Sequence, residues 1–223
     1  QDSFSGRFAD DVSISLASQP RASVPQAHWK GQAGSWSRAE NWRDGKPDPA
    51  RDRISITGEG EAVISVGAVN DEREGSALVA LNVGFNPGAE AELSIEGSLE
   101  TRGRAFIGRN NAKSIVDLAG GTWNAGDGLI RMAQYGTRGL DTESKLWVRQ
   151  GGSLRAATLE MVHDLTELHL EDGVVELENL RIGGNDGQAL VRLSGGELKV
   201  GNLVFGPGNG ILRFDSQSAK LLL

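Results

Sequence analysis

The chain has 223 residues and no cysteine, which excludes disulfide bonds and thiol chemistry. Aromatic residues make up only 5% of it, which suits a narrow core rather than a wide one. No run approaches the ~18 consecutive apolar residues of a membrane helix, so we expect no membrane span. Acidic residues outnumber basic ones by 30 to 23, and the net charge of −7 argues against a nucleic-acid partner.

Glycine is abundant, at 31 residues, and much of it lies within a repeat. A hydrophobic-x-hydrophobic triplet is followed by a glycine-containing bend, a single apolar residue and a second triplet. The second triplets end at positions 83, 107, 132, 161, 182 and 205, at intervals of 21 to 29 residues. The clearest copy consists of Val191-Arg192-Leu193, Gly195-Gly196, Leu198 and Leu203-Val204-Phe205.

This repeat predicts the fold. In a strand, the flanking residues of a triplet point to one face and the middle residue to the other. One turn buries too little apolar surface to be stable, whereas stacked turns form a continuous core. We therefore predict an all-β fold, a single-stranded parallel β-helix (β-solenoid) of about six turns, right-handed because right-handed crossovers prevail. An antiparallel β-sandwich is the alternative, but it does not require one register to recur over more than 120 residues.

Three regions are distinguished along the chain. Residues 1–27 form an N-terminal arm with one alternating strand at 12–16, which folds over its own solenoid or pairs with a neighbouring subunit. Residues 28–58 contain Trp29, Trp36 and Trp42, which we expect to cap the first turn; stacking on sugar rings is the alternative. Residues 59–223 form the β-solenoid.

The Trp-rich segment carries a resemblance. Its spacing, followed by Leu-x-Leu-x-Gly-Gly-x-Leu turns, is Trp36-x4-Asn41-Trp42-x2-Gly45-x-Pro47-x4-Asp52-x-Ile54. Over residues 29–223 the pattern resembles the repeat regions of bacterial secreted and surface β-helix proteins, including autotransporter passengers and adhesin-like proteins. The resemblance implies export and a role at the cell surface or in the extracellular matrix, and it brings no catalytic motif. A first residue, Gln1, that is not methionine also favours a secreted or cell-surface protein after signal-peptide removal.

The middle residues of the aligned triplets form two outward columns. Neither column contains the stacked carboxylates that a glycosidase or a calcium-dependent lyase requires. Arg131, Glu160 and Arg181 alternate in sign and predict an ion-pair ladder. Glu167, His169 and Glu171 share one face, which we interpret as solvated rather than as a metal site. We therefore expect no catalytic residue, no metal and no cofactor.

Two sets of residues are candidates for contacts with partners. The last turn ends in three leucines, which are a poor solvent cap. Either the natural chain continues past Leu223, or this end contacts another subunit; with the apolar residues of the arm, the second alternative predicts head-to-tail self-association. The residues of this first set are Phe4, Phe8, Val12, Ile14, Leu16, Leu221, Leu222 and Leu223. Tyr135, in the lengthened loop 134–142, and Trp147 are candidate contacts for a polysaccharide.

These features favour an exported, non-enzymatic structural or adhesive surface protein that assembles head-to-tail into filaments. The alternative is a carbohydrate-active β-helix, either a polysaccharide lyase or hydrolase or a glycan-binding module.

Overall fold

The computed structural model describes residues 26–30, 34–35, 38–43, 45, 53–56, 61–64, 80–84, 88, 90–109, 112–134, 143–163, 165–184 and 187–223. In this part of the chain the elements are β-strands, apart from one short 3-10 helix, η1 (Ala39–Asn41). All pairs between these described strands are parallel, and one isolated antiparallel bridge joins Trp29 to Trp42 outside them. The predicted parallel β-solenoid is therefore confirmed, and the antiparallel sandwich is excluded.

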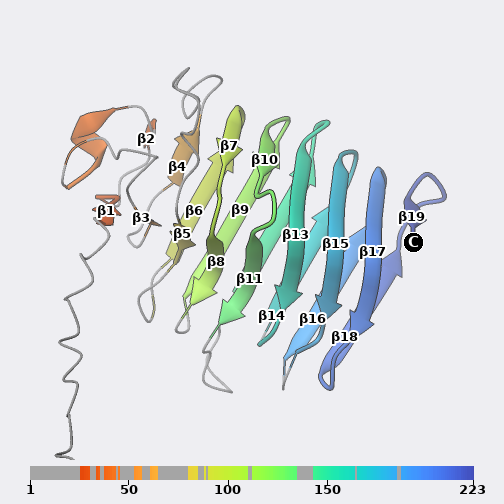
Figure 1. Cartoon of the computed structure of the whole chain (residues 1–223). Helices are drawn as coiled ribbons and strands as arrows, with labels where there is room; N and C mark the ends of the chain where they lie inside the picture. The colour runs from red at the N-terminus through yellow and green to blue at the C-terminus, as the bar shows by residue number, and fades with distance from the viewer. Residues whose placement is uncertain are drawn as a thin grey trace, which may run out of the picture.

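The strands form two sheets that face each other along the solenoid, from β1 at one end to β19 at the other (Figure 1). The main path of the 11-stranded sheet is β1 (Gln26–His28), β3 (Arg53–Ile56), β5 (Ala80–Val83), β8 (Arg104–Arg109), β11 (Leu129–Gln134), β13 (Ser153–Met161), β15 (Val174–Ile182), β17 (Glu197–Phe205) and β19 (Lys220–Leu222). Two short strands also belong to this sheet: β10 (Thr122–Asn124) pairs with β13, and β7 (Ser98–Glu100) pairs with β10. The 8-stranded sheet consists of β2 (Gly34–Ser35), β4 (Glu61–Ile64), β6 (Glu90–Ile95), β9 (Lys113–Ala119), β12 (Glu143–Arg149), β14 (Leu165–Leu170), β16 (Gln188–Leu193) and β18 (Asn209–Phe214).

The pairing register is the one that the repeat predicts. The last residues of the second triplets pair in turn: Val83, Ile107, Met132, Met161, Ile182 and Phe205. The single apolar residues after the bends also pair in turn: Leu99, Trp123, Leu154, Val175 and Leu198. All of these side chains are fully buried except Phe205, which lies on the last turn. Stacked turns thus share one continuous apolar core.

Glycine directly follows four of the six second triplets, as Gly84, Gly108, Gly183 and Gly206, whereas Ala133 and Val162 follow the other two. Gly108, directly after Ile107, has a φ of 69°, a conformation that side chains with a Cβ adopt at a cost. A Cβ at this position would also lie 1.9 Å from Oγ of Ser144, at the start of β12, the strand of the 8-stranded sheet that belongs to the following turn. The two sheets can approach each other at this corner because Gly108 has no side chain and Ser144 has a small one.

The described strands of residues 26–56 belong to the same two sheets. Trp29 and Trp42 are each 1% exposed, and their rings pack edge to face with centroids 5.0 Å apart. Asn41 Nδ2 donates to the carbonyl oxygen of Ser35 at 2.9 Å, so the Asn-Trp pair of the sequence motif connects β2 to this small aromatic core. Several predicted features lie outside the described residues: the arm residues Phe4, Phe8, Val12, Ile14 and Leu16, together with Trp36 and Tyr135.

No helix in the described part of the chain has the length and apolar composition needed to cross a membrane.

Candidate functional site

Trp147, one of the two predicted glycan contacts, lies on the outer face of β12. Its indole stacks on the imidazole of His169 in β14, with centroids 4.0 Å apart and planes inclined by 12°. His169 Nε2 in turn lies 2.7 Å from Oε2 of Glu167. The imidazole therefore covers one face of the indole, which leaves only its other face and its edge for a sugar ring.

Ion pairs surround this stacked pair. Arg149 Nε and Nη2 donate to the two carboxylate oxygens of Asp117 at 3.0 and 2.5 Å, and Lys145 Nζ lies 2.5 Å from Glu143 Oε1. The hydrogen bond from Lys145 to Glu143 raises the pKa of Lys145, and the hydrogen bond to Asp117 raises the pKa of Arg149. The charged groups of this face thus largely neutralise one another.

The residues that the structure describes do not have the geometry of a metal site. Among them, no group of three or more His, Cys, Asp or Glu side chains is arranged to hold a metal ion. Glu167 and His169 are in contact with each other, and Lys145 Nζ also lies 4.0 Å from Glu167 Oε2.

The predicted ion-pair ladder is formed at its first step. Arg131 of β11 bonds through Nε and Nη2 to Oε2 of Glu160 in β13. The described part of the chain shows no ion pair between Glu160 and Arg181, although these residues are paired in register and Arg181 is exposed.

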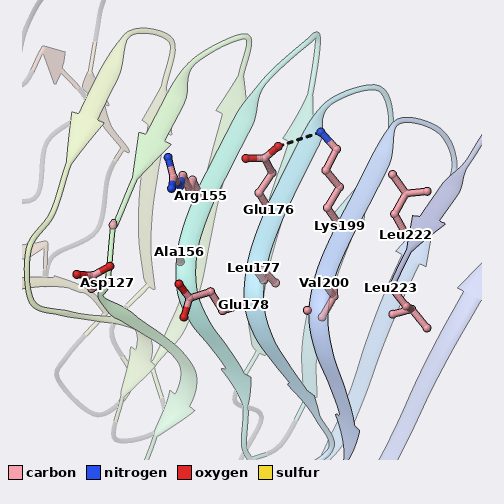
Figure 2. A pocket seen from close by; sticks show the side chains of 12 residues that line it. Asp127, Arg155, Ala156, Glu176, Leu177, Glu178, Lys199, Val200, Leu222 and Leu223 are labelled. Carbon is pink, nitrogen blue, oxygen red and sulfur yellow. Dashed lines mark hydrogen bonds and ion pairs between the residues drawn. The ribbon is translucent and has the colours of Figure 1, made fainter.

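A groove that the sequence did not reveal follows the axis of the solenoid across the 11-stranded sheet (Figure 2). It consists of two adjoining depressions of about 450 and 270 Å³, which share Gly126 and Asp127. We call this feature the axial groove. Its lining residues are Glu100, Thr101, Arg102, Asn124, Ala125, Gly126, Asp127, Arg155, Ala156, Glu176, Leu177, Glu178, Lys199, Val200, Gly201, Leu222 and Leu223.

The axial groove lies where the long strands bend. In β13 the inward residues are Leu154 and Ala156 before the bend and Leu159 and Met161 after it, so the alternation shifts by one residue. The same shift occurs in β15 between Leu177 and Leu180. The bends stack on one another, and they place Ala156, Leu177 and Val200 along the bottom of the groove with 3%, 6% and 3% exposure.

The walls of the axial groove are charged. One wall is a column of outward side chains, one from each turn, and each of them directly follows the single apolar residue after the bend. The residues of this column pair from turn to turn: Glu100, Asn124, Arg155, Glu176, Lys199 and Leu222. Asp127 and Glu178 line the groove beside this wall (Figure 2). Lys199 Nζ donates to Glu176 Oε1 at 2.9 Å, and this hydrogen bond raises the pKa of Lys199. In the sequence these residues form a third outward column, beside those of the two triplets, but such a column does not by itself indicate a groove.

The C-terminal end of the solenoid exposes residues that earlier turns bury. Phe205 and Phe214 are 51% and 50% exposed, whereas their register partners Ile182 and Leu193 are 0% exposed. Leu222 and Leu223 are 47% and 79% exposed, while Leu221 is half-buried against the core. Among the described strands, β18 and β19 are the last of their sheets and each has a neighbour on one side only.

Comparison of the chain with protein-family models, with curated proteins and with solved structures found no match. The functional conclusions below therefore depend on the geometry and chemistry of this chain.

Proposed function

We propose that this chain is a non-enzymatic structural β-solenoid of an exported surface protein, and that a turn of a second copy covers its C-terminal end. The observation that carries the proposal is the half exposure of Phe205 and Phe214, at positions that are fully buried one turn earlier. Apolar side chains beside open strand edges favour association with another sheet.

The geometry favours a second copy of the solenoid as the partner. Both sheets are parallel, and both end in an open edge: β19 and β18 at one end, β1 and β2 at the other among the described strands. A copy displaced along the axis adds its strands in the same direction, so both sheets continue at the usual ~4.8 Å spacing. Because this contact joins two different surfaces, it generates an open filament. The location at the cell surface rests on the resemblance of the Trp-rich segment.

Light scattering over a wide range of protein concentration, together with electron microscopy, tests this assembly. We expect the wild-type mass to rise with concentration and filaments to form, whereas Phe205→Lys/Phe214→Lys stays monomeric because two charges would be buried in the contact. Leu165→Lys is the matched control, since Leu165 is 48% exposed but lies on β14, within the stack. A wild-type chain that stays monomeric throughout, or an end variant that assembles as well as the control, refutes the proposal.

A carbohydrate-active β-helix is the second candidate, and the acidic residues of the axial groove favour it. Asp127, Glu176 and Glu178 all line this groove, and glycosidases use pairs of carboxylates. Mass spectrometry of products, after incubation with acidic and neutral polysaccharides, distinguishes the two candidates. Cleavage of any of them contradicts the non-enzymatic assignment, whereas intact polymers support it.

A further inference from the structure

We infer that the axial groove is a binding site for an uncharged linear polysaccharide. The groove crosses six strands of the 11-stranded sheet, β7, β10, β13, β15, β17 and β19. At the ~4.8 Å spacing of neighbouring strands it extends over about 24 Å. It therefore fits an extended polymer that lies along the solenoid axis better than a compact small molecule.

The composition of the groove matches the amphipathic character of a sugar chain. Ala156, Leu177 and Val200 belong to the core and are 3%, 6% and 3% exposed, so only a narrow apolar strip reaches the floor of the groove. A pyranose ring presents C–H groups on its faces, which can pack on such a strip, and hydroxyl groups at its edge. Arg155 donates hydrogen bonds and Glu178 accepts them, so the walls can pair with hydroxyls of either orientation.

The charges of the groove argue against a polyanion. Its walls carry four acidic residues and three basic ones: Glu100, Asp127, Glu176, Glu178, Arg102, Arg155 and Lys199. A nucleic acid or an acidic polysaccharide requires an excess of positive charge. The acidic residues here would repel either of them, whereas neutral hydroxyls pair with both signs of charge.

The strand direction argues against an extended peptide. Peptides that bind to sheets do so by adding a strand along an open edge. The axial groove runs across paired strands, whose register partners are already fixed on both sides in β13, β15 and β17. A peptide in the groove would therefore leave most of its backbone donors and acceptors without partners.

The axial groove and Trp147, the glycan contact predicted from the sequence, lie on different sheets. Trp147 lies on the 8-stranded sheet, and His169 covers one face of its ring. None of the residues that line the axial groove is aromatic, so binding depends on many hydrogen bonds along a long polymer. All of the lining residues belong to one molecule, so binding does not depend on the head-to-tail assembly.

Native affinity electrophoresis tests the inference with defined probes. The protein is run in gels that contain hydroxyethyl cellulose, galactomannan, polygalacturonate or no polymer. We expect at least one of the two neutral polymers to retard the wild type and polygalacturonate to have no such effect. Arg155→Ala/Glu178→Ala removes one donor and one acceptor of the walls, and it should weaken binding about tenfold.

Three control variants make the result specific. Arg181→Ala removes an exposed arginine of the same sheet outside the groove, and it should bind as the wild type does. Phe205→Lys/Phe214→Lys should also keep its binding, which separates the groove from filament assembly. Circular dichroism confirms that each variant is folded. The inference is overturned if neither neutral polymer retards the wild type, if polygalacturonate alone does, if the wall variant is retarded as strongly as the wild type, or if Trp147→Ala alone abolishes retardation.

Discussion

At position 108, the lack of space for a Cβ disfavours a side chain more strongly than the positive φ does. Gly108 has a φ of 69°, and an added Cβ would lie 1.9 Å from Ser144 Oγ, which is itself buried without a hydrogen-bond partner. Gly108→Ala therefore combines strain at positive φ with overpacking of a corner. We expect it to lower the free energy of unfolding by about 3 kcal/mol, measured by urea denaturation.

Gly151 provides the matched control for this change. Its φ is 76°, yet nothing lies within 4 Å of an added Cβ, so Gly151→Ala should lose only the ~1 kcal/mol of conformational strain. In Gly108→Ala/Ser144→Ala the hydroxyl is gone, and part of the loss should be recovered. Equal losses at Gly108 and Gly151, or no recovery in the double variant, would contradict the steric explanation.

At the scale of the strand, a carboxylate joins β16 to β18. Asp215 follows β18 and accepts hydrogen bonds from Arg192 of β16 and, at 2.5 Å, from Arg213 of β18. The bond from Arg192 makes the largest contribution to lowering the pKa of Asp215. A lowered carboxyl pKa contributes stability above the ordinary aspartate pKa of about 3.9, and this stability is lost as the pH falls through the folded-state value.

Thermal denaturation at several pH values tests this pairing. Between pH 5 and acidic conditions below about pH 3 we expect the Tm of Asp215→Asn to fall less than that of the wild type, because the variant has no carboxylate to protonate. The difference should be small, since exposed ion pairs contribute little. Arg192→Gln removes the main donor and should reduce the pH dependence in the same direction. Parallel Tm curves for the wild type and both variants would rule out the contribution.

The sequence predicted the strands well because their register is carried by apolar residues. Ile107, Met132 and Met161 pair as expected even though the chain between the last two contains the lengthened loop. Burial decides these positions, and burial leaves a periodic signal. The lining of the axial groove leaves none: Arg155, Glu176 and Lys199 alternate with apolar residues as in any strand with one solvated face.

The groove could not be predicted because it depends on how the strands bend. A shift of one residue in the alternation, between Ala156 and Leu159, marks the bend in β13. In the sequence, the same spacing is equally compatible with two separate strands joined by a short turn, as in β10 and β11. The direction of the bend, and therefore the side on which a hollow forms, follows only from the stacked backbone.

At the scale of the whole molecule, the solenoid is a row of turns in which each turn contacts its neighbours (Figure 1). Stability in such an array is close to a sum over turns and the interfaces between them. Leu170, Leu193 and Phe214 occupy one column in successive turns, yet the first two are 0% exposed and Phe214 is 50% exposed. Equivalent substitutions along this column should therefore differ in their consequences.

Substitutions in this column distinguish the stability of a single molecule from the additional stability that assembly provides. Leu170→Ala leaves a cavity and should cost about 2–5 kcal/mol, so its Tm is lowered at every protein concentration. If second copies cover the C-terminal end, the Tm of the wild type rises with concentration, because association stabilises the folded state. Phe214→Ala should have a Tm near that of the wild type in dilute solution and lose much of this rise, whereas Leu170→Ala keeps it. Differential scanning calorimetry over a wide concentration range measures both effects. A wild-type Tm that does not depend on concentration, or a Phe214→Ala variant with an undiminished rise, would show that the exposed end is not where the molecules meet.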